Sequence, residues 1–302
     1  MPTAPSSNYR HILGIRFYVG PLGGLIEQTR QGGLIVVPSA PVLVGLTGDP
    51  AHRQALEASD LAVTDSGFMV ILWGIFQRER LVRISGLRYL RTLLDWREFR
   101  EPGATFWIMP SKRDEVGNRF WLAEQGMAVA EDECYIAPIY SSQGPLEDPA
   151  LLALIEARRP RFVMINLGGG VQERLGWYLK DALEKAETGN LKPESSDSCP
   201  APQTSSFSSH ASSSSSDLRF QVSGFDRPAS PAYHPALICT GAAIAFLSNR
   251  QVNIPPWADR LVLGWLMRSL SEPAKFIPRY WRSLRLVALL WKHGSKSVSL
   301  ET

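Results

Sequence analysis

Short apolar runs alternate with longer amphipathic stretches from Ile12 to about Lys192. This alternation is typical of βαβ units, which build a largely parallel sheet flanked by helices. The apolar runs that we expect to form strands are residues 34–37, 42–45, 61–64, 105–109 and 162–167. The stretches with helical spacing are residues 50–58, 88–96, 115–125, 149–158 and 172–187, the last ending at a Gly189-Asn190 helix stop. The pattern therefore predicts an α/β fold with a Rossmann-like sheet.

A serine-rich stretch interrupts this alternation. Twelve of the 24 residues from 193 to 216 are serine, so the stretch cannot bury enough apolar surface to offset its ordering entropy. We expect residues 193–230 to be a disordered insertion. Afterwards residues 236–239 predict a strand, Thr240-Gly241 a turn and residues 242–247 a helical turn. The predicted core therefore consists of residues 1–192 and 231–270, and residues 271–302 form a C-terminal appendage.

The appendage combines basic and apolar positions at helical spacing. No acidic residue lies between Glu272 and Glu301. The basic residues include Lys275, Arg279, Arg282, Arg285 and Lys292. The apolar face, opposite the first four of these, would consist of Phe276, Tyr280, Trp281, Leu284, Val287, Ala288 and Trp291. Leu286, Leu289 and Leu290 interrupt the polar face. The pattern fits an amphipathic helix that docks on the core, and equally one that lies on a membrane surface.

Composition restricts the class of protein. With 44% hydrophobic and 20% charged residues, the chain can bury a sizeable core. Its 32 Lys and Arg against 29 Asp and Glu give a net charge of +3, which lacks the basic excess of a dedicated nucleic-acid binder. The longest charge-free apolar runs, residues 67–76 and 236–248, are shorter than the roughly 20 residues that span a bilayer. The N-terminal segment lacks the pattern of a signal peptide, so we expect a cytoplasmic protein.

The cysteines and histidines do not suggest a metal site or a disulfide framework. Cys134, Cys199 and Cys239 are far apart and form no Cys-x-x-Cys pair, and the five histidines show no ligand spacing. The chain also has no Asp-x-Asp pair for a nucleotide-bound divalent ion. We therefore expect reduced structural thiols, no metal and no cofactor.

Asp65 is a candidate for chemistry because of its place after a predicted strand. It follows the apolar residues 61–64, and ligands of open α/β sheets bind at the carboxyl ends of strands. A carboxylate there can act as general base toward a hydroxyl group. The alternative is an N-cap for the helix that follows, which is a common role for Asp.

Two further segments could contact phosphate. Gly168, Gly169 and Gly170 lead from a predicted strand into a helix, whose N-terminal N–H groups and dipole suit an anion. The same glycines are equally compatible with a tight turn that needs glycine torsions. The basic run at residues 78–83 could pair guanidinium groups with a diphosphate, or form a solvated surface.

Five motifs follow one another in the C-terminal part of the chain: residues 240–246, Pro255-Pro256-Trp257, residues 263–268, Glu272-Pro273 and Arg279-Tyr280. Their order and spacing resemble those of the WecG/TagA/CpsF family of bacterial glycosyltransferases, glycosyltransferase family 26. Gln172-Glu173 is similar to the family's Pro-x-Gln-Glu, Asp65 to its Asp-Gly, and residues 83–86 to its Arg-Val-x-Gly. The resemblance covers nearly all of the chain except the serine-rich insertion.

The resemblance implies an inverting, metal-independent transferase in cell-surface polysaccharide biosynthesis. It would move an N-acetylaminosugar of the N-acetylmannosamine type from UDP to a polyprenyl-diphosphate-linked sugar, with Asp65 as the catalytic base. The residues implied in substrate binding are Ser39, Arg83, Gly168, Gly169, Gly170, Gln172, Glu173, Arg279 and Arg282. The appendage would approach an anionic membrane surface, which places the protein peripherally on the inner face of the plasma membrane.

Some positions depart from the family pattern. Ser66 stands where the family has Gly, Arg88 where it has Asp, and Gly264 where it has Glu; Pro38-Ser39-Ala40 replaces a Thr-x-Asn stretch. Altered polar groups in a pocket change ligand discrimination strongly. The alternative is therefore a catalytically inactive family member that binds a nucleotide sugar or acts as a scaffold. The sequence is compatible with a monomer and with a homo-oligomer.

Overall fold

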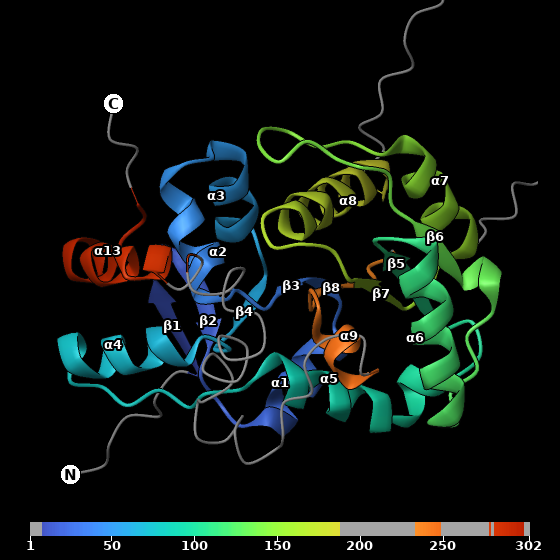
Figure 1. Cartoon of the computed structure of the whole chain (residues 1–302), viewed down its shortest axis with the longest axis horizontal. Helices are drawn as coiled ribbons and strands as arrows, with labels where there is room; N and C mark the ends of the chain where they lie inside the picture. Colours follow the sequence, from blue (N-terminus) through green and yellow to red (C-terminus); the bar gives the residue numbers. More distant parts are fainter. Residues whose placement is uncertain (1–7, 188–232, 249–277, 279–280, 299–302) are drawn as a thin grey trace, which may run out of the picture.

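The computed structural model describes residues 8–187, 233–248, 278 and 281–298. In this part of the chain an eight-stranded sheet runs through the centre, with helices on both faces (Figure 1). The strands are β1 (Tyr9–Ile12), β2 (Ile15–Tyr18), β3 (Gly33–Val36), β4 (Leu61–Val63), β5 (Thr105–Met109), β6 (Cys134–Ile136), β7 (Phe162–Ile165) and β8 (Ala236–Cys239). Their order is β1-β2-β4-β3-β8-β7-β5-β6; β1 and β2 pair antiparallel and the other neighbours parallel. The predicted α/β fold with a largely parallel sheet is confirmed.

The helices connect these strands and cover the sheet. The α-helices are α1 (Leu22–Arg30), α2 (Ala40–Val44), α3 (Pro50–Glu57), α4 (Gly67–Gln77), α5 (Gly86–Asp95), α6 (Lys112–Glu124), α7 (Pro149–Arg158), α8 (Val171–Glu187), α9 (Ala243–Leu247) and α13 (Arg285–His293). Three short 3₁₀ turns are η1 (Gly45–Thr47), η2 (Arg97–Arg100) and η3 (Glu131–Glu133). None of the helices described is both long and apolar enough to cross a membrane.

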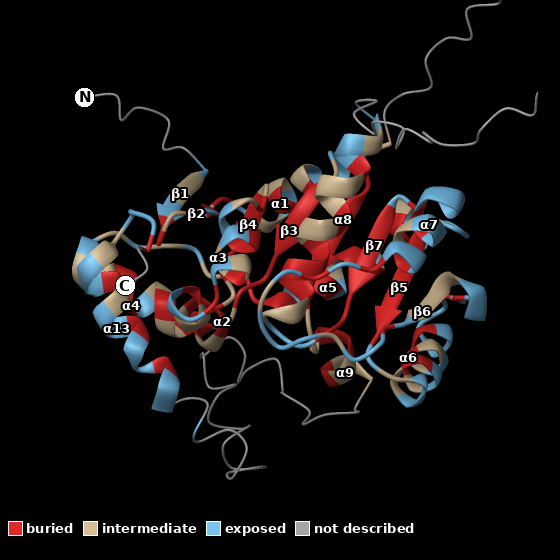
Figure 2. Ribbon diagram, turned by 90° about the horizontal axis from the view of Figure 1, so that it is seen from above, coloured by how far each residue is buried: buried red, intermediate tan, exposed pale blue. Residues whose placement is uncertain are grey.

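The central strands are buried on both faces. In β3, Leu34 and Val36 belong to a core cluster shared with α3, α7 and α8, whereas Ile35 belongs to a cluster on the opposite face shared with α1, α5 and α9. Figure 2 shows these strands buried along their length. Parallel strands covered on both sides consist of nearly continuous apolar residues. This explains why the sequence pattern identifies them.

One predicted strand is wrong. Residues 42–45 form the end of α2 and the start of η1. Ser39 precedes α2 in an extended conformation, and Pro41 occupies its first turn, where proline's fixed torsion suits a helix start. Val42 and Leu43 are buried as they would be in a strand. A short apolar run therefore does not by itself distinguish a strand from a helix.

The two halves of the sheet meet at β3 and β8. One half, β1-β2-β4-β3, comes from residues 9–63, and the other comes from residues 105–165 and 236–239. Because the strands are parallel, the loops after β3, β4, β7 and β8 lie at one edge, which we call the carboxyl edge. Ligands of open α/β sheets bind at this edge where the strand order changes direction.

The C-terminal helix docks on the core by a face that differs from the predicted one. Helix α13 packs against α4 and α2 through Leu286 and Leu290, which are 0% and 1% exposed. The described residues of the predicted apolar face remain exposed, with Trp281 at 74% and Trp291 at 78%, whereas Phe276 and Tyr280 lie outside the described residues. The leucines that interrupt the polar face thus make the docking contact. The helix has two apolar sides, one toward the core and one toward solvent.

Other predictions about these segments fall outside the described residues. They are the disordered insertion at residues 193–230, the Gly189-Asn190 helix stop, and the completion of the core from residue 249 to 270.

Candidate functional site

Asp65 lies at the carboxyl edge, two residues beyond β4. Its Oδ1 accepts a hydrogen bond of 2.9 Å from the N–H of Gly86, the first residue of α5. Gly86 also packs closely on the loop after β3, because a Cβ at this position would lie 2.9 Å from Val37 Cγ1. The half-buried carboxylate is therefore held between the ends of β3 and β4 and the start of α5.

The N-cap interpretation of Asp65 is wrong for the helix that follows it. Ser66 is the N-cap of α4, and its hydroxyl accepts a hydrogen bond of 3.2 Å from Met69 N. Asp65 instead binds the N-terminus of α5, which is distant in sequence. Ser66 thus has a structural role that a hydroxyl serves well.

Arg83 is attached to the same loop. Its Nε donates to the main-chain oxygen of Asp65 at 2.9 Å. The side chain of Thr64 fixes the neighbouring backbone, since its hydroxyl donates to Val82 O at 2.6 Å and accepts from Ile84 N at 3.3 Å. The loops around the end of β4 therefore bring Asp65 and the Arg83 guanidinium together.

The glycine loop after β7, residues 168–170, is fixed by the first turn of α8. Glu173 is 0% exposed, and its carboxylate accepts from Gly170 N at 2.6 Å and from Gln172 Nε2 at 2.9 Å. Gly170 has a φ of +93°, which favours glycine. A Cβ on Gly169 would collide with Val42 of α2. The tight-turn interpretation of these glycines is therefore supported by the geometry.

The same geometry limits how a phosphate could bind. The Glu173 carboxylate occupies the N-terminus of α8 and already uses the Gly170 N–H group. The exposed part of the loop is Gly168 and Gly169. Gln172 is buried beside Gly241 of the loop after β8, and its Oε1 has no hydrogen-bond partner among the described residues. An unpaired buried acceptor at this edge fits a ligand that donates a hydrogen bond.

Side chains at the ends of β7 and β8 join these two loops. Thr240 Oγ1 donates to Asn166 Oδ1 at 3.3 Å, and the Cys239 thiol contacts Gln172 O at 3.3 Å. Burial raises the pKa of the Cys239 thiol, and the Glu173 carboxylate acts in the same direction. The thiol is therefore neutral and structural, rather than a nucleophile.

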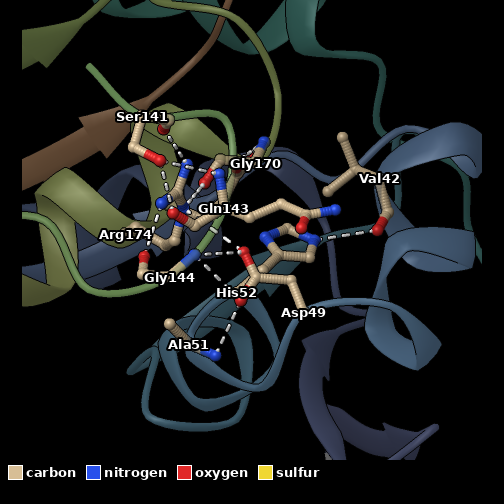
Figure 3. Close-up of polar contacts among 10 residues, drawn as sticks. Val42, Asp49, Ala51, His52, Ser141, Gln143, Gly144, Gly170 and Arg174 are labelled. Carbon is tan, nitrogen blue, oxygen red and sulfur yellow. Dashed lines mark hydrogen bonds and ion pairs between the residues drawn. The ribbon is translucent and has the colours of Figure 1, made fainter.

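A buried guanidinium that the sequence analysis did not single out lies behind the glycine loop (Figure 3). Arg174 donates to the main-chain oxygens of Gly170, Gly144 and Ser141, and its Nε lies 3.7 Å from Asp49 Oδ2. Charged residues on helices usually face solvent, so the pattern of α8 does not indicate this role. Asn166 was also missed, although a polar residue directly after a buried strand is a recognisable feature.

The structure brings most of the predicted site residues to one edge. Ser39 follows β3, Asp65 and Arg83 belong to the loops around β4, and residues 168–173 follow β7. Arg282 is exposed on the segment that leads into α13, and Arg279 lies outside the described residues. Within the described part of the chain, no group of three His, Cys, Asp or Glu side chains could hold a metal ion.

Comparison with known families gives a match that covers most of the chain. Residues 10–188 and 228–299 match the glycosyl transferase WecG/TagA/CpsF family. The matched segments flank residues 189–227, which include the whole serine-rich stretch at residues 193–216. No curated protein matches the chain significantly.

Proposed function

Since the chain belongs to the WecG/TagA/CpsF family of glycosyltransferases, we propose that it transfers an N-acetylaminosugar from UDP to a polyprenyl-diphosphate-linked sugar. The donor sugar is of the N-acetylmannosamine type, and the pathway builds a cell-surface polysaccharide. The observation that carries the proposal is the Asp65 carboxylate at the carboxyl edge, bonded to Gly86 N and beside the Arg83 guanidinium.

The proposed reaction is a direct displacement. Asp65 takes the proton from the acceptor hydroxyl, whose oxygen attacks the anomeric carbon of the donor sugar. The bond from that carbon to the diphosphate breaks, UDP leaves with the electron pair, and the configuration inverts. Arg83 stabilises the charge that develops on the diphosphate. Gln172 Oε1, which is buried without a partner among the described residues, accepts a hydrogen bond from the donor.

Asp65→Asn tests the proposed base, with Asp95→Asn as a matched control. Asp95 is exposed at the far end of α5, the helix whose first N–H group binds Asp65. With UDP-aminosugars and a short-chain lipid-diphosphate acceptor, Asp65→Asn should lower turnover about 100-fold or more and leave donor affinity nearly unchanged. Asp95→Asn should behave as wild type. Absence of both transfer and UDP binding in the wild-type protein would overturn the proposed function.

The C-terminal segment supports a peripheral membrane location for this reaction. Trp281, Leu284 and Trp291 are exposed on it, and Arg282 and Arg285 supply positive charge. Each basic residue near an anionic surface contributes about 1 kcal/mol to binding. The proposed location is the cytoplasmic face of the plasma membrane.

Helix α4 supports the same orientation. It contacts α13 at one end of the molecule (Figure 1) and exposes Ile71 and Ile75. It begins at Gly67, two residues after Asp65, and its 11 residues span roughly 16 Å at about 1.5 Å per residue. The proposed base and the proposed membrane-contacting face are thus joined by one short helix.

Exchange of both exposed tryptophans tests the membrane assignment without removing the buried leucines of α13. Trp281→Ser with Trp291→Ser should abolish most sedimentation with anionic phosphatidylglycerol vesicles and leave the thermal midpoint unchanged. Phe120→Ser is the control, since Phe120 is 67% exposed on α6, on the opposite half of the sheet. Equal sedimentation of both variants would contradict the assignment.

A second candidate is a family member that binds a nucleotide sugar without transferring it. The observation that favours it is the buried Gln172 Oε1, which has no partner among the described residues and could bind a donor whether or not transfer follows. Calorimetric titration with UDP-sugars separates the two functions. Binding without any product in the transfer assay would support the second, and product would exclude it.

A further inference from the structure

We propose that Arg174 is a positioning residue that couples the glycine loop to the loop after β6 and thereby sets the affinity of the site for its donor. The loop after β6 comprises residues 137–148 and also lies at the carboxyl edge. The proposal rests on the proposed function only where it names the donor. Its structural part depends on the hydrogen bonds alone.

The guanidinium joins three segments that are distant in sequence. Its Nε donates to Gly170 O at 3.0 Å, and its two terminal nitrogens donate to Gly144 O and to Ser141 O, the latter at 2.7 Å. Asp49, the N-cap of α3, contributes a carboxylate oxygen 3.7 Å from Nε. Figure 3 shows these groups converging on the guanidinium from different elements.

The burial of Arg174 makes these contacts mutually dependent. The side chain is 1% exposed, and a guanidinium stays charged in a protein, so its charge must be balanced inside the fold. The planar fork matches three carbonyl oxygens in different directions, which the single ammonium of a lysine does not. Loss of the guanidinium therefore frees both loops at once.

Gly170 is held at both of its backbone polar groups. Its N–H group donates to Glu173, and its carbonyl oxygen accepts from Arg174. These two buried residues are adjacent in the first turn of α8. Together they hold the conformation of the last glycine, from which Gly168 and Gly169 extend into solvent. A change at Arg174 is thus transmitted directly to the exposed part of the glycine loop.

The loop after β6 is held at two further points. The Gly144 N–H group donates to both oxygens of Asp49, at 3.3 and 3.4 Å. The Tyr140 hydroxyl donates to Asp148 Oδ2 at 2.6 Å. The carbonyl groups of Ser141 and Gly144 accept their hydrogen bonds from Arg174. Residues 141–144 should therefore loosen when the guanidinium is removed, whereas the hydrogen bond from Tyr140 to Asp148 should persist.

Helix α2 bounds the glycine loop on its other side. Gly169 lies against Val42, whose carbonyl oxygen is 2.9 Å from His52 Nε2 of α3. Asp49, three residues before His52, contacts Arg174. The glycine loop is thus held by Val42 of α2 on one side and by Arg174 on the other. Arg174 also contacts the loop after β6.

Lys180 provides a matched control on the same helix. Its ammonium group is 2.7 Å from Asp60 Oδ1 and 3.2 Å from Ala58 O, so it also ties α8 to a loop through charge-assisted hydrogen bonds. The loop that it holds leads into β4 from the opposite end of the strand. Lys180→Met should therefore loosen α8 without affecting the glycine loop.

Hydrogen exchange, measured by mass spectrometry, tests the structural part. Arg174→Met should accelerate exchange about tenfold in residues 139–147 and 167–171 and leave residues 58–61 unchanged. Lys180→Met should accelerate exchange in residues 58–61 and leave residues 139–147 and 167–171 unchanged. Unchanged exchange in both loops of Arg174→Met would overturn the proposal. If Arg174→Met does not fold, Arg174→Lys decides instead, with faster exchange expected at Ser141 and Gly144 and wild-type exchange contradicting the proposal.

Kinetics with UDP-aminosugars test the functional part. Arg174→Met should raise the donor KM about tenfold while kcat changes less than about threefold, because Asp65 is untouched. A fall in kcat at unchanged KM would overturn the positioning role. If the wild-type protein neither binds nor transfers a UDP-sugar, the proposed function fails, and the exchange experiment still decides whether Arg174 couples the two loops.

Discussion

The loops after β4 and β7 lie at the same edge of one sheet and are held in different ways. Around Asp65, the hydroxyls of Thr64 and Ser66 and the N–H group of Gly86 supply most of the supporting contacts, and the half-buried Arg83 guanidinium donates to the Asp65 main-chain oxygen. Around the glycine loop, they come from the buried charges of Glu173 and Arg174. The first loop presents a carboxylate, whereas the second uses its charges to fix the backbone.

This difference assigns different tasks to the two loops. A group that transfers a proton must reach its substrate, and Asp65 is half-buried at the sheet edge. Glu173 and Arg174 are 0% and 1% exposed, so they act on substrate only through the backbone that they hold. We therefore expect the first loop to control turnover and the second to control donor affinity and stability.

The largest expected effect on stability comes from Glu173. Glu173→Ala leaves Gly170 N and Gln172 Nε2 without their shared acceptor and removes a buried charge close to Arg174. We expect the free energy of unfolding to fall by about 3 kcal/mol, measured by urea denaturation. Glu184→Ala on the exposed side of α8 should cost less than about 0.5 kcal/mol. Equal effects would remove the distinction between the buried and exposed carboxylates.

A smaller effect is expected from backbone strain in the glycine loop. Gly170 has a φ of +93°, whereas Gly168 has no positive φ, and a Cβ would meet nothing within 4 Å at either position. Gly170→Ala should therefore destabilise the fold by about 1–2 kcal/mol, and Gly168→Ala by nearly nothing. Thermal or urea denaturation of the two variants measures the cost of backbone strain separately from packing, because the added Cβ has room at both positions. A neutral Gly170→Ala would show that the loop relaxes freely.

The smallest expected effect is at Ser66, in the other loop. Ser66→Ala should cost about 1 kcal/mol through loss of the α4 cap, and Ser66→Gly only a few tenths. Transfer activity should stay within about twofold for both variants, because Thr64 and Gly86 also support the loop. A large loss of activity in Ser66→Gly would mean that the hydroxyl contacts substrate.

The sequence predicts the central strands because they are buried on both faces. Residues 105–109 and 236–239 are continuous apolar runs and form β5 and β8 with the predicted bounds. Strand β6 was missed because it is a half-exposed edge strand of three residues with no such run. A helix is expected after Asp65, but the nearly uniform apolar composition of α4 hides the helical period and therefore its bounds. Edge position accounts for the missed strand, and uniform hydrophobicity for the missing bounds of α4.

The residues of the candidate site also differ in whether the sequence pattern predicts them. Asp65 is predictable, because a carboxylate directly after a buried strand lies at the carboxyl edge. Arg174 is not, because its partners are main-chain oxygens, two of them 30 and 33 residues earlier, which any residue type can supply. The residues that present a reactive group have a recognisable pattern, whereas those that shape the backbone do not.

The most direct test of the division between the two loops is to measure donor affinity and turnover in Asp65→Asn and Gly170→Ala. Calorimetry gives the Kd for the UDP-sugar, and product formation at saturating donor gives kcat. The account predicts about a 100-fold fall in kcat with an unchanged Kd for Asp65→Asn, and about a tenfold rise in Kd with kcat within about threefold for Gly170→Ala. The account would be contradicted if Asp65→Asn mainly raised Kd and Gly170→Ala mainly lowered kcat. Equal changes of both quantities in both variants would contradict it as well.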